Sequence, residues 1–204
     1  GCGKSITLRK TISVRELDAS AMPARRFYVV DGTPADAFLI ALRLLDREPD
    51  LLVSGINLGP NLGVEDLLHS GTLGATLQAA LHGVPALAIS YGPYRPSERP
   101  TGPELERDLA IAADVGARLA KAILEHGMPE GVGIISVNVP VRPDPRRIVI
   151  TRLLEEPFWT AVRDRDGFFM APWALPDSPP AGRETDAGAL AEGYILSLIH
   201  ISEP

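Results

Sequence analysis

Cysteine is almost absent from this chain of 204 residues, and long apolar runs are missing altogether. A single cysteine, Cys2, excludes an internal disulfide framework and suits a reducing compartment, so we expect a cytoplasmic protein. No apolar run approaches the roughly 20 residues that span a membrane, so no membrane partner is expected. The pattern G-x-G-x-x-G is also missing, which argues against a dinucleotide-dependent oxidoreductase.

Positive charge is scarce as well. The chain has 20 Lys and Arg against 26 Asp and Glu, a formal net charge of −6. Proteins that bind a nucleic-acid backbone need a basic face, so we expect no nucleic-acid partner. A small phosphorylated ligand remains compatible with this balance, because one local site can oppose the overall sign. With 45% hydrophobic residues the chain is able to bury the core of one domain.

Apolar periodicity predicts strands that alternate with helices over residues 1–150. Strands are expected at 6–14, 27–30, from 51, 86–90, 134–139 and 148–151, and helices from 34, from about 72 to 82 and over 104–126. The first helix has a clear start, because Thr33 is able to cap it, Pro34 is its first residue and Asp36 lies in its first turn. Alternation of this kind indicates an α/β fold with a doubly wound, mostly parallel, Rossmann-like sheet.

Residues 151–195 differ in character from the core. The stretch 155–182 carries Trp159, Phe168, Phe169 and Trp173, is rich in proline and has no helical period. We predict an extended β arm or hairpin here, which serves oligomerisation, because a lone arm is not able to bury these aromatics by itself. The alternative is that they pack back on their own domain.

Residues 49–75 form the most informative stretch of the chain. A buried strand from Leu51 leads into a polar loop with glycines at 55, 59, 63 and 71, and a helix follows. Glycines allow backbone N–H groups to approach an anion closely, and a helix N-terminus adds partial positive charge. This predicts a phosphate site made by Gly55, Ser70, Gly71 and Thr72. Simple N-capping by Ser70 is the plainer interpretation, and both hold at once.

Asn57 follows the predicted strand at the edge where ligands bind in such folds. Its amide oxygen suits a hard divalent cation, whereas an asparagine that stabilises a glycine-rich turn is the alternative, which fits Asn61 better. His69 precedes the predicted anion site, but no orienting partner is visible in the sequence, so we assign it no catalytic role.

The segments SGIN, GPNLG and HSGT, in this order, resemble the survival protein E (SurE) family of metal-dependent nucleotide phosphatases. GKSIT near the start, GTPAD at 32–36 and the pair Thr185-Asp186 with Gly193-Tyr194 extend the resemblance over most of the chain. It implies hydrolysis of nucleoside 5′- or 3′-monophosphates to nucleoside and phosphate, with Mg²⁺ or Mn²⁺. Asn57 is then a metal ligand, and the arm implies a homodimer or homotetramer. A non-catalytic phosphate-binding or assembly module is the alternative.

Both ends of the chain raise further expectations. The resemblance implies an Asp-Asp pair and a serine as additional metal ligands, and neither an Asp-Asp-Gly motif nor its strand is present. We therefore expect a core that lacks its first βα unit and a chain that is impaired as an enzyme. Residues 196–204 (LSLIHISEP) depart abruptly from the family and are predicted to be a non-native tail, with a divergent C-terminal strand as the alternative.

Overall fold

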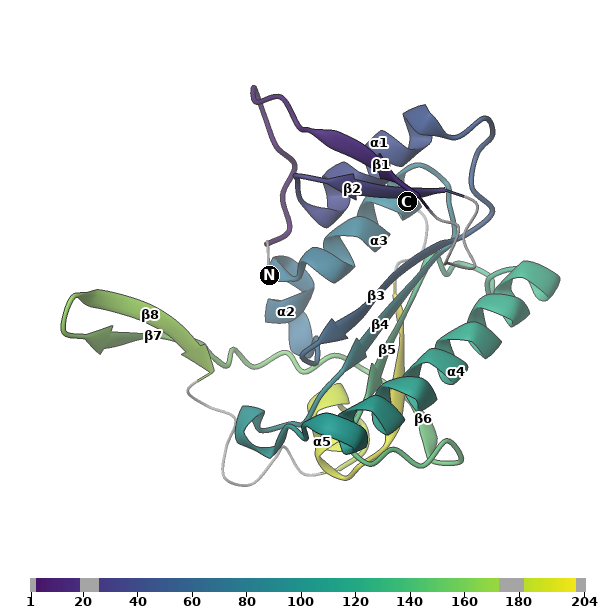
Figure 1. Cartoon of the computed structure of the whole chain (residues 1–204). Coiled ribbons are helices and arrows are strands. Elements are labelled where there is room, and N and C mark those ends of the chain that lie inside the picture. The colour runs from purple at the N-terminus through teal and green to yellow at the C-terminus, as the bar shows by residue number, and fades with distance from the viewer. Residues whose placement is uncertain (1–2, 19–25, 173–181, 201–204) are drawn as a thin grey trace.

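A mixed five-stranded sheet forms the centre of the computed structural model, which describes residues 3–18, 26–172 and 182–200 (Figure 1). Its strand order is β3-β4-β5-β9-β6, from β3 (Leu52–Leu58) through β4 (Ala86–Tyr91), β5 (Ile134–Val139) and β9 (Ile195–His200) to β6 (Ile148–Thr151). The pairs β3/β4, β4/β5 and β6/β9 are parallel, and β5/β9 is antiparallel. The prediction of a mostly parallel α/β sheet is confirmed.

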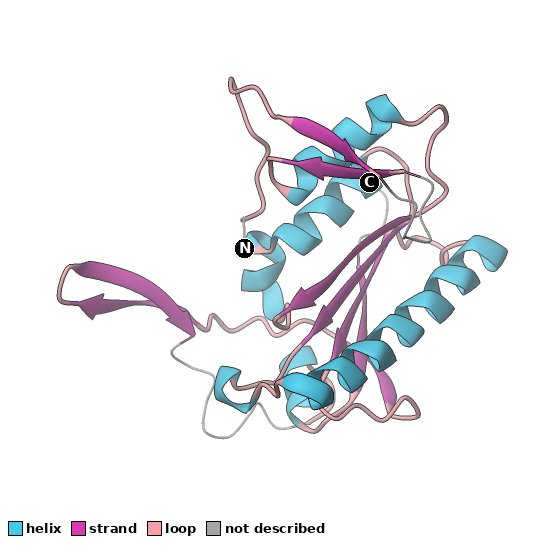
Figure 2. Cartoon of the chain, viewed as in Figure 1, coloured by secondary structure: helices cyan, strands magenta, loops and turns pink. Residues whose placement is uncertain are grey.

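Helices cover both faces of this sheet. Helices α1 (Pro34–Leu44) and α3 (Gly71–Leu81) lie on one side, and the long α4 (Gly102–His126) lies on the other (Figures 1 and 2). Strands β4 and β5 are buried along their whole length, as parallel strands covered on both faces should be. Gly127, with φ of 81°, ends α4 in a conformation that favours glycine.

The smaller elements sit around this core. A two-stranded sheet of β1 (Val14–Leu17) and β2 (Phe27–Val30) lies near α1, and β7 (Trp159–Asp164) pairs with β8 (Gly167–Pro172) in a hairpin. The remaining elements are helices α2 (Gly63–His69) and α5 (Asp186–Ala191) and the 3₁₀ turn η1 (Pro96–Glu98). No helix in the described ranges is long and apolar enough to cross a membrane.

Several predicted boundaries need correction. The strand expected at 6–14 is wrong, because residues 6–13 form no regular element and β1 begins only at Val14. The long polar loop after residue 53 is also wrong, since β3 continues to Leu58 and α2 fills residues 63–69. Polar and glycine residues break the apolar pattern on which the prediction depended. Ser54, Gly55 and Asn57 interrupt the apolar run of β3, which is held instead by pairing with β4.

The hairpin β7–β8 projects away from the rest of the molecule (Figure 1). Phe168, Phe169 and Met170 are 68%, 51% and 64% exposed, so these side chains do not pack back on their own domain. Trp159, at the start of β7, does pack back, since its Nε1 donates to Asp66 Oδ1 at 2.9 Å. The role of the hairpin in oligomerisation stays a prediction. The described residues do not include Cys2, Trp173 or 201–204. Strand β9 spans Ile195–His200, and the non-native origin of residues 196–204 stays a prediction.

The start of α1 is tied to the N-terminal segment through Asp36. Thr33 and Asp36 form a capping box, and the Asp36 carboxylate also accepts from the Thr7 N–H (2.8 Å) and the Thr7 hydroxyl (2.6 Å). Burial alone would raise the pKa of Asp36, but these hydrogen bonds from Thr7 and Thr33 outweigh it and lower the pKa from 3.8 to about 2. The predicted capping role of Thr33 and Asp36 is confirmed.

Protonation of Asp36 should therefore make the protein less stable in acid. Because its pKa is depressed in the folded state, its contribution is present above pH 3.8 and is lost as the pH falls toward 2. We expect Asp36→Ala to lower the free energy of unfolding at pH 7 by about 1–2 kcal/mol and to flatten its dependence on pH over that window. Urea unfolding at pH 7 and at several values below 4 measures both, and an unchanged pH profile in the variant would contradict this role.

Candidate functional site

A cavity of about 230 Å³ opens at the carboxyl end of β3. It is lined by Pro34, Asn57, Asn61, His69, Ser70, Gly71 and Thr72. The structure thus brings together four of the five predicted site residues, Asn57 from the metal prediction and Ser70, Gly71 and Thr72 from the phosphate prediction. A larger cavity of about 400 Å³ lies elsewhere, against Leu39, Arg43 and His82, and contains none of them. We assign the site to the smaller cavity because the chemistry converges there.

The start of α3 supplies the anion-binding part of the cavity. Ser70 caps this helix, since its Oγ accepts a hydrogen bond from the Leu73 N–H at 3.3 Å. Its own N–H donates to the Asp66 carbonyl at 2.8 Å, which makes Ser70 the C-cap of α2 as well. Gly71 and Thr72 are the first residues of α3, so their N–H groups have no carbonyl acceptor within the helix. Two such N–H groups at the positive end of an eleven-residue helix suit a phosphate oxygen.

Asn57 occupies the penultimate position of β3. Its Nδ2 donates to the Gly59 carbonyl at 2.7 Å, which fixes the amide plane and leaves Oδ1 as the end that is able to accept or to ligate. Asn61 plays a different part, because it is buried and both its donors bond to neighbouring strands. Its Nδ2 donates to Ser90 Oγ at 2.5 Å and its N–H donates to Asn138 Oδ1 at 2.7 Å. Asn61 therefore fastens the loop after β3 to strands β4 and β5.

Gly55 is not among the residues that line the cavity. It lies inside β3 with φ of 125°, and a Cβ atom there would collide with the main-chain carbonyl of Ile89. The structure thus accounts for this glycine by close packing against β4. Its predicted contact with phosphate stays a prediction.

Asp186 is a residue whose role the sequence did not disclose. Its side chain is fully buried, its Oδ2 accepts from the Gly63 N–H at 2.6 Å, and its Oδ1 accepts from the N–H groups of Leu154 and Ala187 at 2.9 and 2.8 Å. Burial raises the pKa of this carboxyl, and the three backbone donors oppose that rise. The carboxylate thus joins the start of α2 to the loop after β6. The pair Thr185-Asp186 is visible as a motif, but nothing local points to Gly63.

The described residues alone do not make a divalent-cation site. Within 3–18, 26–172 and 182–200 no group of three or more His, Cys, Asp or Glu is placed to hold a metal ion. Asp36, the carboxylate next to Pro34, has both oxygens occupied by Thr7 and Thr33. Asn57 contributes one neutral oxygen, and Mg²⁺ is usually held by one or two carboxylates. These residues therefore supply only part of the donor set that such an ion needs.

Together these features define a doubly wound α/β protein with a candidate phosphate site at the carboxyl edge of its sheet. The family model for the survival protein SurE matches residues 1–159, so the chain belongs to the SurE family. A curated relative from Methanothermobacter thermautotrophicus, named 5′-nucleotidase SurE, is 37% identical over 185 residues, which cover 90% of this chain and 70% of that protein.

Two further comparisons agree with this membership. A relative of the same name from Methanocella arvoryzae is 36% identical over 166 residues, covering 80% of this chain and 61% of its own length. The crystal structure of the SurE protein from Aquifex aeolicus superposes with a TM-score of 0.72 at 28% identity, over 100% of this chain and 78% of that one. The chain thus spans part of the length of each of these relatives.

Proposed function

We propose that this chain is a phosphomonoesterase of the SurE type that hydrolyses nucleoside 5′- or 3′-monophosphates to nucleoside and phosphate. Relatives named 5′-nucleotidase and the family match support this class of enzyme. The observation that carries the proposal is the single cavity that joins the N-terminus of α3 to Asn57 at the end of β3. Phosphate-ester hydrolysis asks a protein mainly for positioning and for stabilisation of charge, and this cavity supplies both.

The residues of the cavity suggest how the substrate is held. The N–H groups of Gly71 and Thr72 bind phosphoryl oxygens, and the helix dipole stabilises the negative charge that they carry. His69 also lines the cavity, where it is able to contact a bound phosphate ester. Asn57 and Asn61 also line the cavity.

A divalent cation, Mg²⁺ or Mn²⁺, is part of the proposal through the family resemblance, with Asn57 as one ligand. Because the described residues do not complete a metal site, we propose that further ligands come from outside them. When bound, such an ion would withdraw electron density from a phosphoryl oxygen. Both the binding of a metal and the choice between the two ions depend on these further ligands.

The finer features of the protein are also proposals. The exposed apolar side chains on β7–β8 support a homodimer or homotetramer through the arm, because an exposed cluster of this kind favours contact with another chain. A cytoplasmic location agrees with the single cysteine. A non-catalytic phosphate-binding or assembly module remains the second candidate, favoured by the incomplete set of metal ligands among the described residues.

Replacement of Gly71 tests the phosphate site. In a chain extended to carry a full set of metal ligands, Gly71→Val should raise the Michaelis constant for a nucleoside monophosphate by about 10-fold or more, since a side chain blocks the backbone approach that an anion needs. Ala117→Val is the control, because it places the same side chain at an exposed position of helix α4. Steady-state phosphate release provides the measurement. Unchanged kinetics in folded Gly71→Val would count against the site.

A further inference from the structure

The connection between β4 and α4 is longer than this fold requires. It runs over residues 92–101, includes η1 and contains Pro93, Pro96 and Pro100. Connections from strand to helix in α/β units usually take about 2–6 residues, and longer ones are often functional. Prolines restrict the backbone, so this segment is stiff for its length. We name residues 92–101 the proline loop.

The proline loop packs against the segment that carries the candidate site. The Gly59 N–H donates to the Tyr91 carbonyl at 2.8 Å, which joins the end of β3 to the root of the loop. A Cβ atom on Gly92 would lie 2.9 Å from Cδ of Pro60, so the two backbones touch. Further along, Arg99 donates from its guanidinium to the Leu58 carbonyl at 2.9 Å. The loop is therefore fixed beside Asn57 at both of its ends.

The guanidinium of Arg99 and the Asn57 amide both lie beside Gly59, although Arg99 is not among the residues that line the cavity. Asn57 Nδ2 is 3.6 Å, and an Arg99 terminal nitrogen 3.9 Å, from the point where a Cβ on Gly59 would sit. A side chain at position 59 would thus contact both of these polar groups. Arg99 is exposed, and its hydrogen bond to Leu58 engages one of its five N–H donors. In the part of the chain that the structure describes, no carboxylate pairs with it.

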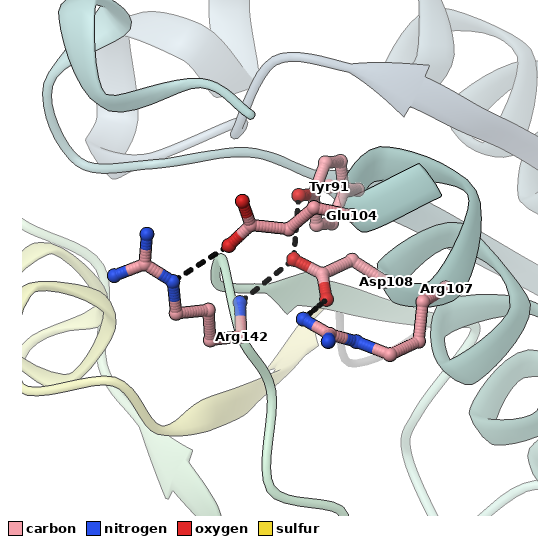
Figure 3. A network of polar contacts seen from close by, with 5 residues as sticks. All are labelled: Tyr91, Glu104, Arg107, Asp108 and Arg142. Atoms are coloured by element: carbon pink, nitrogen blue, oxygen red, sulfur yellow. Dashed lines mark hydrogen bonds and ion pairs between the residues drawn. The ribbon is translucent and has the colours of Figure 1, made fainter. Parts of the chain in front are cut away.

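A polar network around the buried Asp108 holds the root of the proline loop in place (Figure 3). The Tyr91 hydroxyl donates to Asp108 Oδ2 at 2.9 Å, and the same oxygen accepts from the Arg142 N–H at 2.7 Å. Burial and the adjacent Asp108 carboxylate raise the pKa of the Tyr91 phenol, so it stays protonated and continues to donate. Arg107 lies on the other Asp108 oxygen, and Arg142 also bonds Glu104 (Figure 3).

From these contacts we infer that Arg99 is a substrate-binding residue whose long, exposed side chain reaches the phosphate of the nucleoside monophosphate from the end of β3. This inference deepens the proposed function and rests on it. A guanidinium matches the oxygens of phosphate in a two-point contact and remains charged at all working pH values. Hydrogen bonds that involve a charged group are stronger than those between neutral groups, so an arginine beside the site is able to bind phosphate although the chain has a net charge of −6.

Binding of adenosine 5′-monophosphate to residues 1–204 tests the inference. Isothermal titration at low ionic strength compares the unaltered chain with Arg99→Gln and Arg99→Lys, and with Arg118→Gln as a control. Arg118 is also an exposed arginine, but it lies on α4, where it pairs with Asp114. We expect Arg99→Gln to raise the dissociation constant by about 10-fold or more, Arg99→Lys by less, and Arg118→Gln not at all. Far-UV circular dichroism confirms that each variant is folded.

The outcomes distinguish a failure of the inference about Arg99 from a failure of the proposed function. Equal affinity of Arg99→Gln and the unaltered chain would overturn the role of Arg99 and leave the proposed function standing. Absence of saturable binding by the unaltered chain would count against both. The titration is repeated with adenosine in place of its monophosphate. If Arg99→Gln weakens the binding of adenosine by the same factor, Arg99 does not bind the phosphate and the inference fails.

Discussion

Extension of residues 1–204 by an upstream segment with an Asp-Asp pair and a serine is expected to increase EDTA-sensitive phosphate release by about 100-fold or more. The physical reason lies in the donor set. Asn57 supplies one neutral oxygen, whereas carboxylates supply the charge that opposes a divalent cation. The described residues hold no other cluster that replaces them.

The edge of the sheet leads to the same expectation. Strand β3 is the first strand of the sheet, with Val53 46% exposed and Leu58 50% exposed. An edge strand presents unpaired N–H and C=O groups that are able to accept another strand or to promote aggregation. A further strand beside β3 would cover this edge, so the extended chain should be more stable and less prone to aggregate as well as more active.

The assay compares both chains side by side with a nucleoside monophosphate and Mn²⁺ or Mg²⁺, with and without EDTA. Extended chains in which the Asp-Asp pair is replaced by Asn-Asn serve as the control, because they restore the strand without its charge. Robust EDTA-sensitive activity of residues 1–204 alone would contradict the prediction and would point to ligands beyond Asn57.

Elements whose patterns are local were predictable from the sequence. β5 and β6 have the predicted bounds, and α4 begins two residues before its prediction and ends at the predicted His126. Their apolar periods, with Gly127 as a stop signal, contain the information needed. The start of α3 was predictable for the same reason, since Ser70 is a strong capping residue next to Gly71 and Thr72.

Features that depend on distant contacts were not predictable. Helix α2 has no side-chain cap at Leu62, and Gly63, its first residue, is held from far along the chain by Asp186. The contact of Arg99 with the end of β3 accompanies the packing of Gly92 on Pro60, and neither is signalled by a period or a spacing in the sequence. Such pairings become visible only when the sheet brings the ends of β3 and β4 together.

Replacement of Asp186 should damage both the fold and the site, because this one carboxylate satisfies three buried N–H groups. Asp186→Ala leaves these donors without an acceptor, and we expect the free energy of unfolding to fall by about 3 kcal/mol or more. Asp114→Ala is a matched control: Asp114 also lies in a helix, but its side chain is 54% exposed beside Arg118, so its loss should cost no more than about 1 kcal/mol.

Asp186→Asn separates the two parts of this contact. An amide oxygen in place of Oδ1 keeps the bonds from Leu154 and Ala187, whereas the amide nitrogen then faces the Gly63 N–H and is unable to accept from it. We therefore expect an intermediate loss of stability, with local release of the start of α2.

Urea unfolding measures the stability of the three variants, and amide hydrogen exchange at Gly63 reports the local effect. Faster exchange at Gly63 in Asp186→Asn, with exchange in β4 and β5 nearly unchanged, would show that the carboxylate anchors α2 ahead of His69 and Ser70. If Asp186→Ala unfolds at the same urea concentration as Asp114→Ala, the three hydrogen bonds contribute little net stability, and another contact must hold α2 against the sheet.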